Sequence, residues 1–191
     1  LVRSRGLGDV YKRQVYTQQQ SDRLPNTTKK LANNESLKVL FYGDSIFAGG
    51  DASSGRGREP MMPTMDVLMA EYLRTISSGT ITFDNISVGG WTVENGLAAL
   101  QPGGYAGKDY SQYSGYDLLM LSFGMNNAGT SAESFKATTQ EIVETIKEKN
   151  PNIEVILVSC ICPNSCGPYF CNSRDITSTQ RSNAALYFGS S

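Results

Sequence analysis

The sequence predicts an α/β fold, a three-layer α/β/α sandwich in which a parallel sheet lies between two layers of helices. Two observations carry this prediction. Between residues 37 and 159, short apolar runs typical of buried strands alternate with segments of helical character. The chain has 191 residues, of which 39% are hydrophobic, enough for one domain with a buried core.

The first half of this region predicts two strands and a helix between them. Residues 37–42 form an apolar run that Gly43 ends, as expected for a buried parallel strand. Residues 80–86 are rich in β-branched and aromatic side chains and predict a second strand. Between them, Thr64 suits the N-cap of a helix. The apolar residues of this helix recur at i, i+3 and i+4 and form one face: Met65, Leu68, Met69, Tyr72, Leu73 and Ile76.

The second half predicts two more strands and two more helices. A short helix is expected over residues 92–100, and a buried strand over residues 117–122. Thr130 and Glu133 have the spacing of a capping box, which predicts the start of the next helix. The apolar residues of that helix share one face: Phe135, Ile142, Val143 and Ile146. Residues 153–159 complete the pattern as the fourth strand.

The two ends of the chain are interpreted separately from the domain. Residues 1–14 contain the stretch SRGLGDVYKRQ, which resembles one translated frame of a transposon-based sequencing adapter. They are interpreted as an artefactual segment, with an ordinary polar tail as the alternative. Residues 15–35 are polar and aperiodic and are interpreted as a linker. The domain is then expected to span residues 36–171, followed by an uninformative tail over residues 172–191.

All four cysteines lie near the end of the expected domain, at Cys160, Cys162, Cys166 and Cys171. Their spacing matches no zinc-binding pattern. The first two fit the end of a buried strand, and a disulfide among the later ones is the alternative for those.

Composition and charge exclude several classes of function. The chain has no histidine, which removes His-ligated metal sites and the usual general base of serine hydrolases. With 17 basic and 18 acidic residues the net charge is −1, so a strongly cationic nucleic-acid binder is excluded. No apolar run reaches the roughly 18 residues of a membrane span. We therefore expect no metal and no other cofactor.

Polar motifs follow the first three predicted strands at their carboxyl ends, where ligands bind in parallel sheets. They are Gly-Asp-Ser-Ile at 43–46, Ser-Val-Gly-Gly-Trp-Thr at 87–92 and Gly-Met-Asn-Asn at 124–127. Together with the strand EVILVS and the Pro-Asn pair at 163–164, they resemble the SGNH or GDSL hydrolase family of serine esterases. The resemblance implies a flavodoxin-like parallel sheet whose last strand and helix are missing from this sequence.

The resemblance and the chemistry of ester hydrolysis point to the same residues. A serine just past a strand, in a tight glycine turn, projects its hydroxyl into the crevice, so Ser45 is the candidate nucleophile. The oxyanion that forms on attack needs preorganised donors. The candidates are the backbone N–H of Ser45, the backbone N–H of Gly90 and the side-chain amide of Asn126. Gly89 is the alternative to Gly90, one residue away.

Three further residues are weaker candidates for substrate binding, namely Asp44, Trp91 and Asn127. An aspartate in the position of Asp44 typically binds backbone N–H groups of its own turn, which is the alternative role. Asn127 stands where many family members have aspartate, and this difference is interpreted as structural. Trp91 directly follows the candidate oxyanion glycine.

The expected substrate is a carbohydrate or another small acyl ester. Trp91 and the tyrosines of residues 103–116 would suit stacking on sugar rings, with coverage of the sheet edge as the alternative. These tyrosines are Tyr105, Tyr110, Tyr113 and Tyr116. The motif loops look most like those of bacterial esterases that act on O-acylated carbohydrates, which implies acetyl as the acyl group.

The family's general base is a histidine near the end of the domain, and no residue of this sequence matches it. The sequence therefore predicts a serine ester hydrolase that is catalytically incomplete as given, and truncation is the favoured explanation. A non-catalytic module that binds glycans and an unrelated flavodoxin-like binding module are the alternatives. A polysaccharide substrate would imply secretion, but the sequence does not show where the protein is located.

Overall fold

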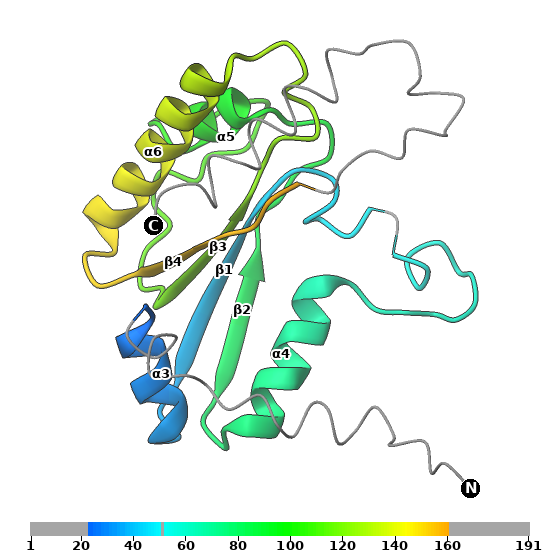
Figure 1. Ribbon diagram of the computed structural model, residues 1–191, viewed down its shortest axis with the longest axis vertical. Coiled ribbons are helices and arrows are strands. Elements are labelled where there is room, and N and C mark those ends of the chain that lie inside the picture. Colours follow the sequence, from blue (N-terminus) through cyan, green and yellow to red (C-terminus); the bar gives the residue numbers. More distant parts are fainter. Residues whose placement is uncertain (1–22, 51, 161–191) are drawn as a thin grey trace, which may run out of the picture.

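The computed structural model describes residues 23–50 and 52–160, in which helices alternate with the strands of one sheet (Figure 1). The strands are all parallel and lie in the order β2-β1-β3-β4. In chain order the elements are α3 (Pro25–Ala32), β1 (Leu37–Gly43), α4 (Met65–Ile76), β2 (Ile81–Asn85), α5 (Val93–Ala99), β3 (Leu118–Ser122), α6 (Ala132–Lys149) and β4 (Glu154–Leu157). The predicted α/β fold with a parallel sheet is confirmed.

The central strands β1 and β3 end at the same level. Gly43, the last residue of β1, lies opposite Ser122, the last residue of β3. Because the strands are parallel, the loops that follow them leave the sheet at the same edge. This carboxyl edge is where the three polar motifs begin.

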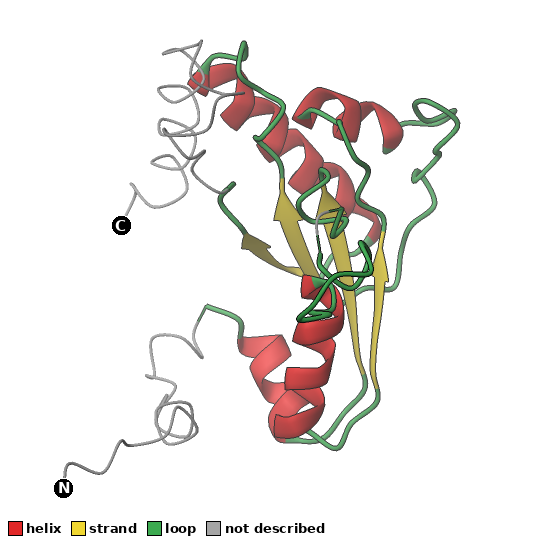
Figure 2. Cartoon of the chain, turned by 90° about the vertical axis from the view of Figure 1, so that its right-hand side faces the viewer, coloured by secondary structure: helices red, strands yellow, loops and turns green. Residues whose placement is uncertain are grey.

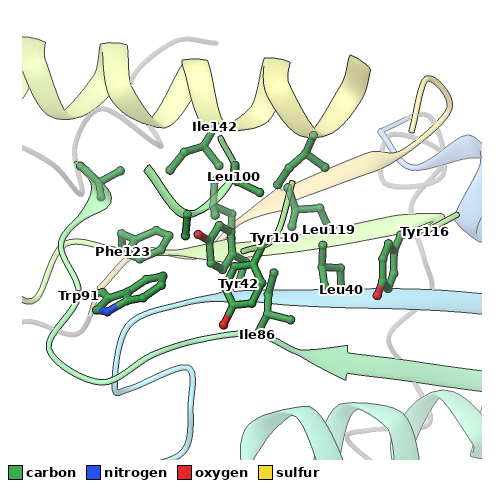
Figure 3. Close-up of a cluster of buried hydrophobic side chains, with 14 of the residues drawn as sticks. Leu40, Tyr42, Ile86, Trp91, Leu100, Tyr110, Tyr116, Leu119, Phe123 and Ile142 are labelled. Atoms are coloured by element: carbon green, nitrogen blue, oxygen red, sulfur yellow. The ribbon is translucent and has the colours of Figure 1, made fainter. Parts of the chain in front are cut away.

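Each face of the sheet has its own hydrophobic core, because successive side chains of a strand point to opposite faces. Leu40 and Tyr42 of β1 pack in the core that includes residues of α5 and α6, whereas Val39 and Phe41 pack on the face that α3 and α4 cover. Figures 1 and 2 show these two pairs of helices on opposite sides of the sheet. The first core is rich in aromatic rings (Figure 3), and the Tyr42 hydroxyl links it to α5 by donating to the Gly96 carbonyl at 2.6 Å.

Helix α4 has the predicted bounds, but its apolar residues do not form one buried face. Leu73 packs against the sheet, whereas Leu68, Tyr72 and Ile76 are exposed. The apolar positions cover more of the helix circumference than the sheet can bury, so the outer stripe faces solvent. Thr64 does occupy the N-cap position, yet its side chain makes no capping hydrogen bond.

Helix α6 begins one residue later than the capping-box pattern predicts. Its N-cap is Ser131, whose hydroxyl accepts the backbone N–H of Ser134 at 3.1 Å. The predicted box of Thr130 and Glu133 is wrong because the Thr130 hydroxyl is instead bonded to the side chain of Asn127 at 3.1 Å. The apolar face of the helix is confirmed, with three residues in the core and one partly buried against it: Phe135, Ile142, Ile146 and Val143.

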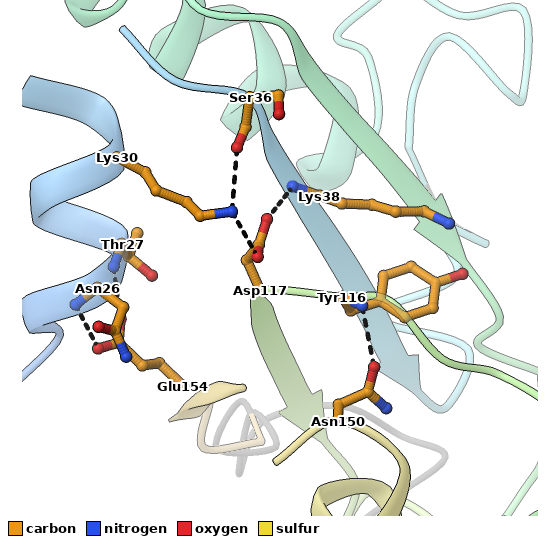
Figure 4. A network of polar contacts seen from close by, with 9 residues as sticks. All are labelled: Asn26, Thr27, Lys30, Ser36, Lys38, Tyr116, Asp117, Asn150 and Glu154. Atoms are coloured by element: carbon orange, nitrogen blue, oxygen red, sulfur yellow. Dashed lines mark hydrogen bonds and ion pairs between the residues drawn. The ribbon is translucent and has the colours of Figure 1, made fainter. Parts of the chain in front are cut away.

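Helix α3 lies within the segment that the sequence predicts to be a linker. The Glu154 carboxylate caps it from β4 by accepting the backbone N–H groups of Asn26 and Thr27 at 2.7 and 2.8 Å. Lys30 forms an ion pair with Asp117 at 2.7 Å (Figure 4). These long-range contacts hold a short polar helix that would be marginal alone. It is therefore part of the domain.

Strand β4 forms one edge of the described sheet and is shorter than the predicted strand. Several sequence-based interpretations lie outside the described residues: the segment 1–14, Cys162, the Pro-Asn pair at 163–164, Cys166, Cys171 and the tail 172–191. Within the described ranges, no helix is long and apolar enough to cross a membrane.

Candidate active site

The turn after β1 depends on a glycine and an aspartate. A Cβ on Gly43 would overlap the carbonyl oxygen of Ser122, so only glycine lets β1 end this close to β3. Asp44 is 2% exposed, and its carboxylate accepts the backbone N–H groups of Ile46 at 3.0 Å and Met125 at 3.3 Å. Asp44 therefore ties the turn after β1 to the loop after β3.

The pKa of the Asp44 carboxyl reflects both its burial and its hydrogen bonds. Burial raises the pKa of the Asp44 carboxyl, and the hydrogen bonds from Ile46 and Met125 offset that effect only in part. Both carboxylate oxygens already accept backbone N–H groups. These two bonds hold the carboxylate in its structural role between the two loops.

Ser45 lies at the tip of this turn and is half-buried. Its carbonyl oxygen accepts the backbone N–H of Gly50 at 3.0 Å, which closes the turn. Among the described residues, neither the Ser45 hydroxyl nor its backbone N–H has a hydrogen-bond partner. Gly89 packs beside it, since a Cβ built there would lie 3.6 Å from the Ser45 Cβ. The turns after β1 and β2 thus meet at this serine.

The turn after β2 packs against the end of β1 and carries two glycines. The backbone N–H of Val88 donates to the Gly43 carbonyl at 3.0 Å and holds this turn against the end of β1. Gly90 has φ of +79°, which favours glycine, and a side chain there would point into open space. In the described part of the chain, the N–H groups of Gly89 and Gly90 donate no hydrogen bond.

Asn126 brings the loop after β3 to the same place. Its side chain is exposed, and its Nδ2 donates to the carbonyl oxygen of Trp91 at 2.9 Å. Because Trp91 directly follows Gly90, this bond holds the Asn126 amide beside the turn after β2. A primary amide has two N–H groups, so one remains for a ligand. These contacts link the loops after β1, β2 and β3, which carry Ser45, Gly90 and Asn126.

Asn127 has a different environment from its neighbour. It is 1% exposed, its Oδ1 accepts the backbone N–H of Val93 at 3.1 Å, and its Nδ2 donates to Glu94 at 2.9 Å and Thr130 at 3.1 Å. Burial raises the pKa of Glu94, but hydrogen bonds from Thr92, Asn127 and Thr130 outweigh this and hold it below its usual value. An amide here both donates and accepts, which aspartate could not do. Asn127 thus fixes the start of α5 to the loop after β3.

The aromatic candidates divide into buried and exposed rings. Trp91 is 7% exposed and packs in the core with Tyr110 at a ring distance of 6.1 Å. Tyr110 and Tyr116 are buried, and Tyr113 is half-buried between them, with rings 5.3 and 6.1 Å away. These three tyrosines cover the face of the sheet. Tyr105 differs because it is 42% exposed.

Sequence reasoning missed Asn85 as a support of the site. Its side chain donates to the Phe47 carbonyl and to Asp66, both at 3.0 Å, and accepts the backbone N–H of Ser87 at 3.1 Å. It therefore connects the first turn of α4 to the segments after β1 and β2. A polar residue at the end of a strand was the available signal.

The loop after Ser45 carries a second polar feature. An open pocket there is lined by Ser53, Arg56, Arg58 and Glu59. The Arg56 guanidinium donates to the carbonyl oxygen of Gly50 at 3.2 Å, which connects this loop to the nucleophile turn. In the described ranges, no group of three or more Cys, Asp or Glu side chains could hold a metal ion.

The model of the GDSL-like lipase/acylhydrolase family matches residues 41–186. A lipase/acylhydrolase from Enterococcus faecalis is 19% identical with a TM-score of 0.51, over 80% of this chain and 72% of that one. A carbohydrate acetylesterase family member from Sinorhizobium meliloti is 19% identical with a TM-score of 0.56, over 80% and 77%. A two-domain esterase active on acetylated mannans is 21% identical with a TM-score of 0.55, over 74% of this chain but 35% of that one. No curated protein sequence matches significantly.

Proposed function

Because the chain belongs to the GDSL-like lipase/acylhydrolase family, we propose that it is a serine ester hydrolase with Ser45 as the nucleophile. The Ser45 oxygen attacks the ester carbonyl carbon, the alcohol leaves, and water later releases the acyl group from the serine. The half-buried position of Ser45 and the lack of a hydrogen bond from its hydroxyl to any described residue support this role.

The observation that carries the proposal is that contacts join the loops after β1, β2 and β3, which hold three candidate N–H donors. The donors are the backbone N–H groups of Ser45 and Gly90 and the side-chain amide of Asn126. They stabilise the negative oxygen of the tetrahedral intermediate, which the ground-state ester lacks. The contact of Gly89 with Ser45 and the bond from Asn126 to Trp91 support their assignment to one oxyanion hole.

Two of the weaker candidates act as positioning residues in this proposal. Asp44 and Asn127 are buried and have hydrogen-bond partners within the protein, so they hold the loops that carry the donors. Trp91 contributes its carbonyl oxygen, which orients the Asn126 amide.

A general base for Ser45 is missing from the sequence given. The chain contains no histidine, the usual general base of serine hydrolases. A site that keeps the oxyanion hole but lacks a triad member retains about 10³–10⁴-fold catalysis over water, far below a complete enzyme. We therefore expect this 191-residue chain to be nearly inactive as a hydrolase.

The substrate we propose is an acylated carbohydrate, with acetyl as the acyl group. Two proteins of similar fold are described as an esterase active on acetylated mannans and as a carbohydrate acetylesterase family member. The second candidate function is a non-catalytic module that binds acylated glycans through the same opening. The absence of histidine favours this alternative, because binding needs no general base.

Hydrolysis of p-nitrophenyl acetate tests the missing base. We expect the rate with the 191-residue chain to match that of its Ser45→Ala variant. Robust turnover that Ser45→Ala abolishes would contradict the expected inactivity and would point to another base.

A longer form that carries the family's histidine tests the oxyanion hole itself. Asn126→Ala should lower kcat by about 10²–10³-fold with little change in KM, because the amide acts mainly on the transition state. A matched Gln140→Ala variant, on the exposed surface of α6, should keep full activity. A loss confined to KM in Asn126→Ala would rule out the oxyanion role.

A further inference from the structure

Of the four tyrosines that follow the turn after β2 and helix α5, one is set apart by its exposure. Tyr110 and Tyr116 are buried in the core, but Tyr105 leaves 42% of its surface open to solvent. Its ring meets Trp91 edge-on, with ring centres 5.7 Å apart and planes at 73°. Among the described residues the exposed aromatic rings are Tyr105 and Tyr72, and Tyr72 lies on α4, across the sheet.

Tyr105 is carried on a tight and rigid turn. It forms an antiparallel bridge with Lys108, in which each backbone N–H donates to the other carbonyl at 2.9 Å. The two residues between them, Ala106 and Gly107, have φ of +49° and +74°, the geometry of a type I′ turn. Alanine is strained in this conformation. Strain of this kind persists where the surrounding structure imposes it, and such sites are often functional.

The base of this turn is also tied to the fold. The Asp109 carboxylate accepts the backbone N–H groups of Gly103 at 3.3 Å and Ser111 at 2.9 Å. The backbone N–H of Tyr110 donates to the carbonyl oxygen of Ala99 at the end of α5, at 2.8 Å. An aromatic ring held this way loses little freedom when a ligand stacks on it, which lowers the cost of binding.

Trp91 connects this ring to the proposed oxyanion hole. The residue before Trp91 is Gly90, and the Trp91 carbonyl accepts the Asn126 amide at 2.9 Å. The backbone of Trp91 thus bonds to a proposed oxyanion-hole residue, while its ring contacts Tyr105.

We propose that Tyr105, supported by Trp91, is the platform on which a sugar ring of the substrate's alcohol part stacks. This inference rests on the proposed ester-hydrolase site and assigns the residue that selects carbohydrate substrates. The turn is polar around the ring, since Gln101, Lys108 and Asp109 are exposed beside it and can bond to hydroxyl groups. A lipid acyl chain would need a continuous apolar groove instead.

The single tryptophan of the sequence makes the proposal directly measurable. Because Trp91 contacts Tyr105, its fluorescence should change when an O-acetylated manno-oligosaccharide is titrated into the protein. Tyr105→Ala should weaken this binding about tenfold, a loss typical of one stacking contact. Tyr105→Phe should bind within about twofold of the wild type, because it keeps the ring.

Tyr72→Ala is the matched control, since Tyr72 is 43% exposed and lies on the opposite side of the sheet. It should bind the oligosaccharide as the wild type does. An unchanged affinity in Tyr105→Ala, an equal loss in Tyr72→Ala, or no binding by the wild type would overturn the proposal. Unfolding curves of each variant in urea distinguish a lost contact from a lost fold.

A second probe separates this inference from the proposed function. Methylphosphonate, a small tetrahedral anion without a sugar, should perturb the amide resonances of Ser45 and Gly90 equally in the wild type and in Tyr105→Ala. If the anion binds at Ser45 and Gly90 but the affinity for the oligosaccharide does not depend on Tyr105, only the stacking platform is wrong. If the affinity for the oligosaccharide depends on Tyr105 but the anion does not bind at Ser45, the stacking platform is supported and the oxyanion hole is wrong.

Discussion

At the amino ends of the strands, carboxylates are matched to donors, whereas at the carboxyl ends several backbone donors have no acceptor in the described part of the chain. Asp117 accepts the backbone N–H of Lys38 at 2.9 Å and pairs with Lys30 at 2.7 Å (Figure 4). At the opposite edge, the N–H groups of Ser45 and Gly90 have no acceptor among the described residues. Matched polar groups stabilise the fold, while open donors favour a ligand that supplies the acceptor. Substitutions at the two ends should therefore separate stability from binding.

The largest effect on stability is expected at the amino ends. Asp117→Ala removes the acceptor of the Lys38 backbone N–H and the carboxylate paired with Lys30, whose ammonium keeps only the Ser36 carbonyl at 3.3 Å. We expect the free energy of unfolding to fall by about 3 kcal/mol, measured by urea unfolding. Glu148→Ala, on the exposed surface of α6, should change it by less than about 0.5 kcal/mol. A loss of similar size in both variants would contradict the special role of this network.

At the carboxyl ends, two adjacent asparagines should behave oppositely. Asn127→Ala removes the acceptor of the Val93 N–H and the donor to Glu94, so unfolding should become easier by about 2 kcal/mol. Asn126→Ala removes an exposed amide and should change the same quantity by less than about 0.5 kcal/mol, yet abolish methylphosphonate binding. Urea unfolding and anion titration of both variants check this pair. Equal destabilisation would show that Asn126 is a structural residue.

A smaller effect is expected at the cap of α3. Glu154→Gln keeps one oxygen that can accept from the backbone N–H groups of Asn26 and Thr27, but it loses the negative charge at the helix N-terminus. The free energy of unfolding should fall by about 1 kcal/mol. Amide hydrogen exchange should accelerate within α3 and stay unchanged at the carboxyl edge. Faster exchange across the whole sheet would argue against a local cap.

The smallest expected effect is a pH dependence of the free energy of unfolding. It is small because hydrogen bonds from backbone N–H groups partly offset the effect of burial on the Asp44 pKa. The folded-state pKa of Asp44 lies above its ordinary value of 3.8, so its stabilising contribution is present below that pH and is lost as the pH rises through the folded pKa. Asp44→Asn should remove this slope in urea unfolding at a series of pH values. Asp109→Asn should change the pH dependence in the opposite direction, because hydrogen bonds from Ser111 lower the pKa of Asp109. A change of the pH dependence in the same direction in both variants would contradict the assigned causes of the two pKa shifts.

The order of strands and helices was predictable because most elements reflect local patterns. Buried parallel strands such as β1 and β3 are continuous apolar runs, and α6 shows a clear helical period. Helix α3 was not predictable, since its cap comes from Glu154, which lies 128 residues from Asn26. The exposed stripe of α4 was missed because a periodic pattern does not tell how much of a helix the sheet can cover.

The candidate site was predictable to the level of loops. The motifs located Ser45, Gly90 and Asn126 at one edge, because parallel strands bring their carboxyl ends together. The sequence does not tell which of two neighbouring side chains is buried in hydrogen bonds and which one is exposed. That depends on how the loops pack in three dimensions. Asn126 is exposed and Asn127 is buried, although the two asparagines are adjacent. Likewise, only the structure separates Tyr105 from the buried rings of Tyr110 and Tyr116.

The most direct test of the oxyanion hole is an NMR titration of the ¹⁵N-labelled chain with methylphosphonate. The backbone amides of Ser45 and Gly90 and the side-chain amide of Asn126 should shift together, with one common affinity, and Asn126→Ala should abolish these shifts. Shifts confined to the loop of Arg56 and Arg58, or no shift at Ser45 and Gly90, would contradict the claim that these three donors form one anion-binding site.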